Sequence, residues 1–218
     1  MKQFDFYEFT GILVPGVAAL AGILLLYPAA FKPEFIKDFS VGGLGLFVVL
    51  AYVLGHLVQA VGNAVESAWW KAFGGMPTDW VRSKPDSLLA PAQVTALEQT
   101  AKERLNMPDL QIGQCSKGQW YGLTRQIHAD VAAAGRVSRV EIFNGNYGLN
   151  RGIGSGLLVA LVTSLFQTPI NWTFVGLVAT AAGLALYRMH RFARHYAREL
   201  FVQFLQLPAQ DTNKEKSS

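Results

Sequence analysis

The sequence predicts an all-α integral membrane protein with four transmembrane helices and a small helical cytoplasmic insertion between helices two and three. Three features of the 218-residue chain lead to this prediction. They are long apolar stretches without charge, basic residues that gather on one side of those stretches, and one polar middle segment. Together they indicate that lipid surrounds most of the chain and that water surrounds the middle segment.

Two apolar stretches in the first third of the chain are each long enough to cross a bilayer. Residues 10–31 and residues 39–65 contain no Asp, Glu, Lys or Arg, and about 20 apolar residues cross a hydrocarbon core of ~30 Å. Such segments must be helical, because the bilayer offers no water to the backbone groups. We therefore expect an N-terminal transmembrane hairpin, residues 1–66. The alternative is a soluble bundle with an unusually apolar core.

A second transmembrane pair is expected near the C-terminus. Residues 152–187 also lack charge, and the turn-forming residues 167–171 divide this stretch into two helices of about 17 to 19 residues, the lower end of the spanning range. Residues 138–150 contain no proline and can lead into the first of these helices without a break. The predicted third and fourth transmembrane helices therefore occupy residues 139–187.

The segment between the two pairs, residues 67–138, is the predicted cytoplasmic insertion. Its ~70 residues are few for a robust independent core. Glycines and prolines over residues 74–85 predict a loop. Pro91 is expected to open a helix that Pro108 ends, and a second helix is expected to end near Gly135. Each helix has an apolar stripe at helical spacing. The first stripe is Val94, Leu97, Ala101 and Leu105, and the second is Trp120, Leu123, Ile127 and Val131.

The distribution of Lys and Arg predicts the orientation. The loop between helices one and two carries only Lys32 and Lys37, and the turn between helices three and four carries no charge. Basic flanking segments stay in the cytoplasm, so both termini and the insertion should be cytoplasmic. The net charge of +4 reflects this asymmetry, and no nucleic-acid partner is expected. Trp69, Trp70 and Trp172 lie where headgroup-level anchors are expected.

A polar stripe on helix two is the most informative intramembrane feature. Its residues fall within an arc of about 80° on a helix and are Tyr52, His56, Gln59, Asn63 and Glu66. Ionisable or amide side chains are costly against lipid and usually face inward. The stripe is consistent with hydrogen bonding between helices of one chain. It is also consistent with an aqueous route formed by several subunits, in which His56 could change charge near neutral pH, or with a ligand pocket.

Helix three carries small residues at every fourth position, namely Gly148, Gly152, Gly156 and Ala160. This spacing makes a smooth stripe that lets a neighbouring helix approach closely. The neighbour is expected to be helix two or four of the same chain, or a helix of another subunit. The polar start of helix three should meet Glu66, and an ion pair of Glu66 with Arg151 or Arg139 would neutralise charges that are costly near lipid.

Helix four continues into a basic amphipathic cytoplasmic helix, residues 188–207. The polar tail that follows it, residues 208–218, is expected to be disordered. Its basic residues lie within an arc of about 120° and include Arg188, Arg191, Arg194 and Arg198. Anionic lipid headgroups are the simplest partner for these arginines. A phosphate-bearing nucleotide, RNA or a partner protein are the alternatives.

We expect no enzymatic activity, no metal and no cofactor. The histidines at 56, 128, 190 and 195 have no metal-ligand spacing, and the sequence contains no nucleophile elbow and no P-loop. The single cysteine, Cys115, excludes an internal disulfide and a cysteine-cluster metal site.

Residues 6–16 (FYEFTGILVPG) and 138–151 (SRVEIFNGNYGLNR), with the arginine-rich end of helix four, resemble small bacterial multi-helix membrane proteins. Some proteins of that kind act in phage defence by opening or disrupting the inner membrane. The resemblance implies a multi-pass protein of the bacterial inner (plasma) membrane.

Two functional hypotheses follow from these features. In the first, the chain forms a homo-oligomer in the membrane that acts as a channel-like or membrane-perturbing effector, with the helix-three stripe joining subunits. In the second, it is a non-conducting membrane anchor or scaffold that recruits a soluble cytoplasmic partner protein through the insertion and the basic helix.

Overall fold

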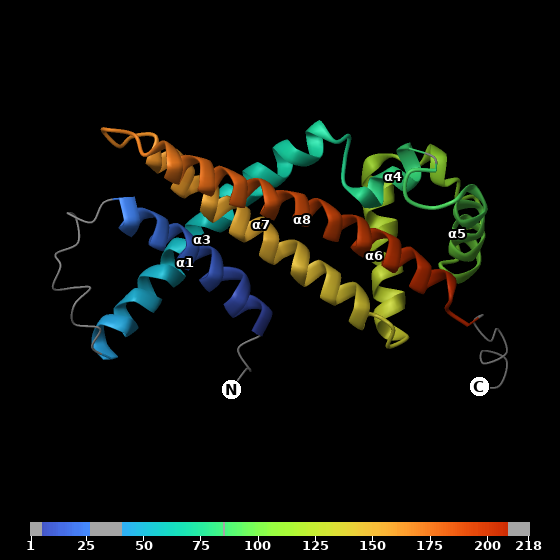
Figure 1. Ribbon diagram of the computed structural model, residues 1–218. Helices are drawn as coiled ribbons and strands as arrows, with labels where there is room; N and C mark the ends of the chain where they lie inside the picture. The colour runs from blue at the N-terminus through green and yellow to red at the C-terminus, as the bar shows by residue number, and fades with distance from the viewer. Residues whose placement is uncertain (1–5, 27–40, 85, 209–218) are drawn as a thin grey trace. The chain divides into compact units, whose positions relative to one another are not determined.

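The computed structural model describes residues 6–26, 41–84 and 86–208, and all the regular elements in these ranges are helical. The elements are α1 (Phe6–Leu26), α3 (Val41–Ala72), α4 (Pro77–Ser83), α5 (Pro91–Arg104), η2 (Ile112–Gln114), α6 (Lys117–Ala133), α7 (Ser138–Ser164) and α8 (Trp172–Leu205) (Figure 1). The all-α prediction is therefore confirmed for the described residues. The expected disorder of residues 209–218, and the ends of the first two predicted spans at residues 27–31 and 39–40, lie outside them.

The chain forms two compact units. The first consists of Met1–Lys71 and Gly145–Phe192, and the second consists of Ala72–Asn144 and Ala193–Ser218. Helices α7 and α8 each contribute residues to both units. Residues 193–205 of α8 thus belong to the same unit as most of the predicted insertion.

In the first unit, α1 and α3 are in backbone contact at two glycines. A Cβ atom added at Gly16 would overlap the backbone oxygen of Ala51, and one added at Gly55 would overlap the backbone oxygen of Ile12. Figure 1 shows the two helices crossing. Such close approach is possible because the glycine at each contact has no side chain, which is how small residues stabilise pairs of membrane helices.

The turn between α7 and α8 lies where the sequence predicts it. Helix α7 begins at Ser138 and runs unbroken to Ser164, and α8 begins at Trp172. Asn171 caps α8, because its side-chain oxygen accepts a hydrogen bond from the backbone N–H of Phe174 at 3.0 Å. The two helices lie side by side (Figure 1), and Gly154 of α7 faces Leu186 of α8.

Two helices, α3 and α8, are long and apolar enough to cross a membrane. Only 17% of the apolar window of α3 and 22% of that of α8 are buried inside the structure. A core helix of a soluble protein would be mostly buried, so these two helices have the surface expected of lipid-exposed helices. The exposed apolar residues of α3 include Leu44, Leu46, Val49, Val53, Leu57 and Val61.

Helices α1 and α7 are less extensively apolar. The apolar described part of α1, Gly11–Leu26, is shorter than a usual span. Helix α7 carries Arg139, Glu141 and Arg151 in its first half, so its longest charge-free stretch is residues 152–164. The apolar part of each of these helices is therefore shorter than the ~20 residues that cross a hydrocarbon core.

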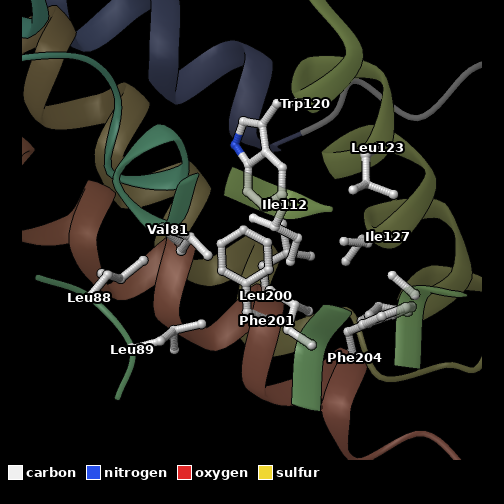
Figure 2. Close-up of a cluster of buried hydrophobic side chains, with 14 of the residues drawn as sticks. Val81, Leu88, Leu89, Ile112, Trp120, Leu123, Ile127, Leu200, Phe201 and Phe204 are labelled. Atoms are coloured by element: carbon white, nitrogen blue, oxygen red, sulfur yellow. The ribbon is translucent and has the colours of Figure 1, made fainter. Parts of the chain in front are cut away.

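The second unit has an apolar core of its own, to which α4, α5, η2, α6, the start of α7 and the end of α8 all contribute. The predicted α6 stripe of Trp120, Leu123, Ile127 and Val131 is buried, which confirms it. From α8, Phe201 stacks near Trp120 with ring centroids 5.9 Å apart (Figure 2). The core is thus larger than residues 67–138 alone could supply.

Helix α4 was not predicted and lies within residues 74–85, for which the sequence predicts a loop. Pro77 occupies its first turn, where a missing N–H costs nothing, and the side chain of Asp79 accepts a hydrogen bond from the backbone N–H of Met76 at 3.2 Å. Gly74 and Gly75 precede it with φ of 75° and 104°, so the chain leaves α3 through two left-handed residues. Trp80 of α4 is buried and donates to the backbone oxygen of Gly75 at 3.0 Å.

The α1–α3 contact predicts that Gly55→Ala destabilises the protein. The added methyl group would meet the backbone of Ile12, and overpacking of this kind typically costs about 1–3 kcal/mol. Thermal unfolding of the purified protein in a neutral detergent measures the effect. Gly45→Ala is the matched control, because Gly45 is on the same helix and nothing lies within 4 Å of an added Cβ. Equal unfolding temperatures for the two variants would contradict the contact.

The second-unit core predicts that Phe201→Ala loosens the insertion even though the substitution lies near the end of the chain. Removing a fully buried phenylalanine side chain costs about 3–5 kcal/mol. Limited proteolysis should then cut residues 86–136 faster than in the unaltered protein. Tyr121→Ala removes an aromatic ring that is 62% exposed and should change the rate little. Unchanged cleavage of the Phe201 variant would show that α8 is dispensable for this core.

Candidate functional site

The strongest polar cluster of the first unit joins α3 to α7 and centres on Glu66. One carboxylate oxygen of Glu66 accepts a hydrogen bond from the Tyr147 hydroxyl, and the other forms an ion pair with the Arg151 guanidinium. Side chains of the ion pair are only 21% and 25% exposed. The pair is therefore largely removed from solvent, and the Tyr147 hydrogen bond satisfies the remaining carboxylate oxygen.

Two tryptophans of α3 extend this cluster toward α8. Trp70 is buried and its indole N–H donates to the Tyr147 hydroxyl at 3.0 Å. Trp69 donates to the Nδ1 atom of His190 at 3.3 Å, and the Trp70 and His190 rings lie 5.2 Å apart. The side chains predicted to anchor at headgroup level thus make hydrogen bonds within the chain, because each indole N–H has a partner on a neighbouring helix. Trp172 is 69% exposed, as a headgroup-level anchor would be.

A glycine allows the polar side chains to approach. A Cβ atom at Gly62 would lie 3.2 Å from the Ser155 hydroxyl and 3.8 Å from two atoms of the Arg151 side chain. Ser155 is buried and donates to the backbone oxygen of Arg151 at 2.8 Å. The Arg151 side chain therefore lies against α3, where it reaches Glu66.

The other members of the predicted polar stripe are not drawn into this cluster. Tyr52 and His56 form an edge-to-face pair with ring centroids 4.8 Å apart. Tyr52 and Gln59 are half-buried, whereas His56 and Asn63 are exposed. The stripe thus divides into an interior end at Glu66 and an exposed part that carries His56 and Asn63 among apolar neighbours.

The small-residue stripe of α7 packs against α1 of the same chain. Added Cβ atoms at Gly152 and Gly156 would overlap or touch Pro15, and one at Gly22 of α1 would touch Ala160. Gly148 has nothing within 4 Å and takes no part in the contact. The sequence predicted helix two or helix four of the same chain, or another subunit, as the neighbour. The neighbour in the structure is helix one. Because α1 occupies the stripe, it is not free to join subunits.

The remaining predicted site residues lie on other surfaces. Arg139, the alternative partner of Glu66, forms an ion pair with Glu199 at 3.4 Å instead, because both belong to the second unit. Arg188, Arg191, Arg194 and Arg198 of α8 are all exposed. Asn150 is buried, and its amide donates to the backbone oxygen of Asn146 at 2.7 Å.

Tyr147 and Trp70 are the members of the cluster that sequence reasoning did not assign to it. The helical spacing could have assigned them to the cluster, because residues four apart share one face of a helix. Tyr147 lies four residues before Arg151 on α7, and Trp70 lies four residues after Glu66 on α3. Trp70 was instead predicted to be a headgroup-level anchor, and Tyr147 was assigned no role. Each has a polar atom that needs a partner when buried.

The cluster can hold charge and fix the relation of α3 to α7, but it has no arrangement that suggests a reaction. Within residues 6–26, 41–84 and 86–208, no group of three or more His, Cys, Asp or Glu side chains could hold a metal ion. No protein-family model, curated protein or solved structure matches this chain.

The ion pair predicts that Glu66→Gln lowers thermal stability in detergent while leaving membrane insertion intact. The substitution leaves Arg151 without its counter-charge, at a cost of about 2 kcal/mol for a lost charged hydrogen bond in a partly buried site. Glu141→Gln is the control, since Glu141 is an exposed acid on α7. The double variant Glu66→Gln with Arg151→Gln should be less destabilised than the sum of its single variants. Additive losses would show that the two side chains do not interact.

Proposed function

We propose that this chain is a multi-pass protein of the bacterial inner membrane that self-associates and acts as a channel-like or membrane-perturbing effector. Helices α1, α3, α7 and α8 provide the four transmembrane segments, and the second unit and both termini lie in the cytoplasm. Exposed polar residues on α3, His56 and Asn63, carry the proposal because their neighbours on the same helix are apolar and uncovered.

The cost of placing polar groups against lipid is the main argument for self-association. His56 and Asn63 are seven residues apart and so lie on one face of α3, about 10 Å apart along its axis. Polar and ionisable side chains inside a bilayer are usually turned toward protein or water rather than lipid. A second copy of α3 would remove both side chains from the acyl chains and could enclose a polar route between the copies.

The surface left for such contact is the exposed face of α3. The glycine stripe of α7 is already filled by α1, so the interface between copies is proposed on α3 instead. A role in phage defence rests on the resemblance of residues 6–16 and 138–151 to small bacterial membrane effectors, which is an analogy of sequence and not of site chemistry.

The proposal predicts that expression of the protein in bacteria lowers the membrane potential, read with a potential-sensitive dye. The double variant His56→Leu with Asn63→Leu should leave the potential unchanged at equal membrane abundance, because it removes the polar groups from the route. The control is Val53→Leu with Val61→Leu, which keeps the face apolar at two exposed positions of the same helix. An unchanged potential with the unaltered protein, under every inducing condition tried, would refute the effector function.

A second function is favoured by the independent core of the second unit. In this alternative, the membrane helices conduct nothing and serve to hold the second unit at the membrane, where it recruits a soluble cytoplasmic partner. Purification from gently solubilised membranes distinguishes the two functions. A stoichiometric partner that is lost on deletion of residues 85–135 would favour the anchor, and a homo-oligomer without such a partner would favour the effector.

A further inference from the structure

The exposed face of α8 changes from apolar to basic along its length. Leu177 and Leu184 are 68% and 60% exposed, and Arg188, Arg191, Arg194 and Arg198 are exposed further along the helix. At 100° per residue the two leucines project from the helix within the arc of about 120° that the four arginines cover. One side of a continuous helix therefore presents aliphatic side chains first and guanidinium groups afterwards.

Packing on the opposite side holds the arginines outward. Met189, Ala193, Ala197 and Leu200 are at most 2% exposed. Because this side is fixed by contacts within the chain, rotation of α8 about its axis would expose apolar surface and bury arginine. The basic side is therefore a permanent feature of the fold.

The four arginines have no acidic partner among the described residues. Arg188 lies 5.4 Å from the centre of the Phe192 ring, and Arg198 donates to the backbone oxygen of Leu88 at 3.3 Å. The nearest acid along the helix, Glu199, is paired with Arg139. The positive charge of this face is thus not neutralised within the described part of the chain, and it is available to an external anion.

Helix geometry places the arginines at the depth of lipid phosphate groups. Trp172 is exposed at the first residue of α8 and is typical of a membrane interface. A hydrocarbon core of ~30 Å, measured along an untilted helix from Trp172 at 1.5 Å per residue, ends near residue 192. Arg191 then lies at the edge of the core, and Arg188 lies about 6 Å inside it, close enough for its long side chain to reach the headgroups. Arg194 and Arg198 are within about one Debye length of that edge.

We propose that this arginine face of α8 binds the phosphate groups of anionic phospholipids in the cytoplasmic leaflet. The inference rests on the proposed membrane location, and it adds a lipid class and a binding surface to it. Arginine suits this role because its guanidinium makes paired hydrogen bonds to phosphate oxygens. Since the same turns of α8 carry core residues of the second unit, bound lipid also restrains the helix on which that core is built.

The test uses the full chain in neutral-detergent micelles, titrated with phosphatidylglycerol or with uncharged phosphatidylcholine, and counts retained lipids by native mass spectrometry. The protein should retain phosphatidylglycerol preferentially, and less of it as the salt concentration rises. Arg191→Gln with Arg194→Gln should weaken that retention by about fivefold for each arginine, from the ~1 kcal/mol that each basic residue contributes near an anionic surface. Arg191→Lys with Arg194→Lys should keep most of it.

Arg125→Gln with Arg136→Gln is the matched control, because it removes the same charge from two exposed residues of the second unit. An equal loss in this control, or equal retention of both lipids by the unaltered protein, would overturn the proposal. So would displacement of phosphatidylglycerol by an equimolar RNA oligonucleotide or by inorganic phosphate. Loss of lipid preference with the dye response intact would refute the lipid site alone, whereas an absent dye response with intact lipid preference would refute only the effector function.

Discussion

Apolar side chains of α3 and α8 lie at the surface of the chain, and each Å² of apolar area left in water costs about 25 cal/mol relative to burial. Only 17% of the residues in the apolar window of α3 and 22% of those in the window of α8 are buried by the rest of the chain. In the proposed function, lipid and a second copy cover this surface, and the other features of the first unit are consistent with that arrangement. Close glycine contacts between helices and the ion pair of Glu66 within the chain can both stabilise helix packing where the hydrophobic effect does not form a core.

The two halves of the predicted polar stripe differ in the partners of their polar groups. Glu66 has its counter-charge and a hydroxyl donor on α7, so its charge is compensated inside the chain. His56 and Asn63 are exposed on α3, and His56 contacts only the Tyr52 ring among the described residues. The Glu66 ion pair holds α3 against α7, whereas the exposed His56 and Asn63 are available to contact a second copy in the proposed assembly. The proposed effector function depends on His56 and Asn63, and the stability of the single chain depends on the Glu66 ion pair.

Sequence patterns predicted the elements better than their partners. Charge-free length, the turn at residues 167–171 and the stripe from Trp120 to Val131 are local properties, and the helices α7, α8 and α6 follow them. Which helix fills the stripe at Gly152 and Gly156 depends on the three-dimensional arrangement, because a smooth surface accepts any neighbour, and the neighbour is α1. The contribution of Phe201 to the second unit was hidden for a similar reason, since some 70 residues separate it from α6.

The most direct test of the account asks whether lipid surrounds the uncovered helices. Membranes from cells that express the protein are washed with alkaline carbonate, sedimented at high speed and then extracted with a mild detergent. The account predicts that the protein stays in the washed membrane pellet and becomes soluble, folded and monodisperse only in detergent. Recovery of the folded chain in the detergent-free supernatant would contradict it.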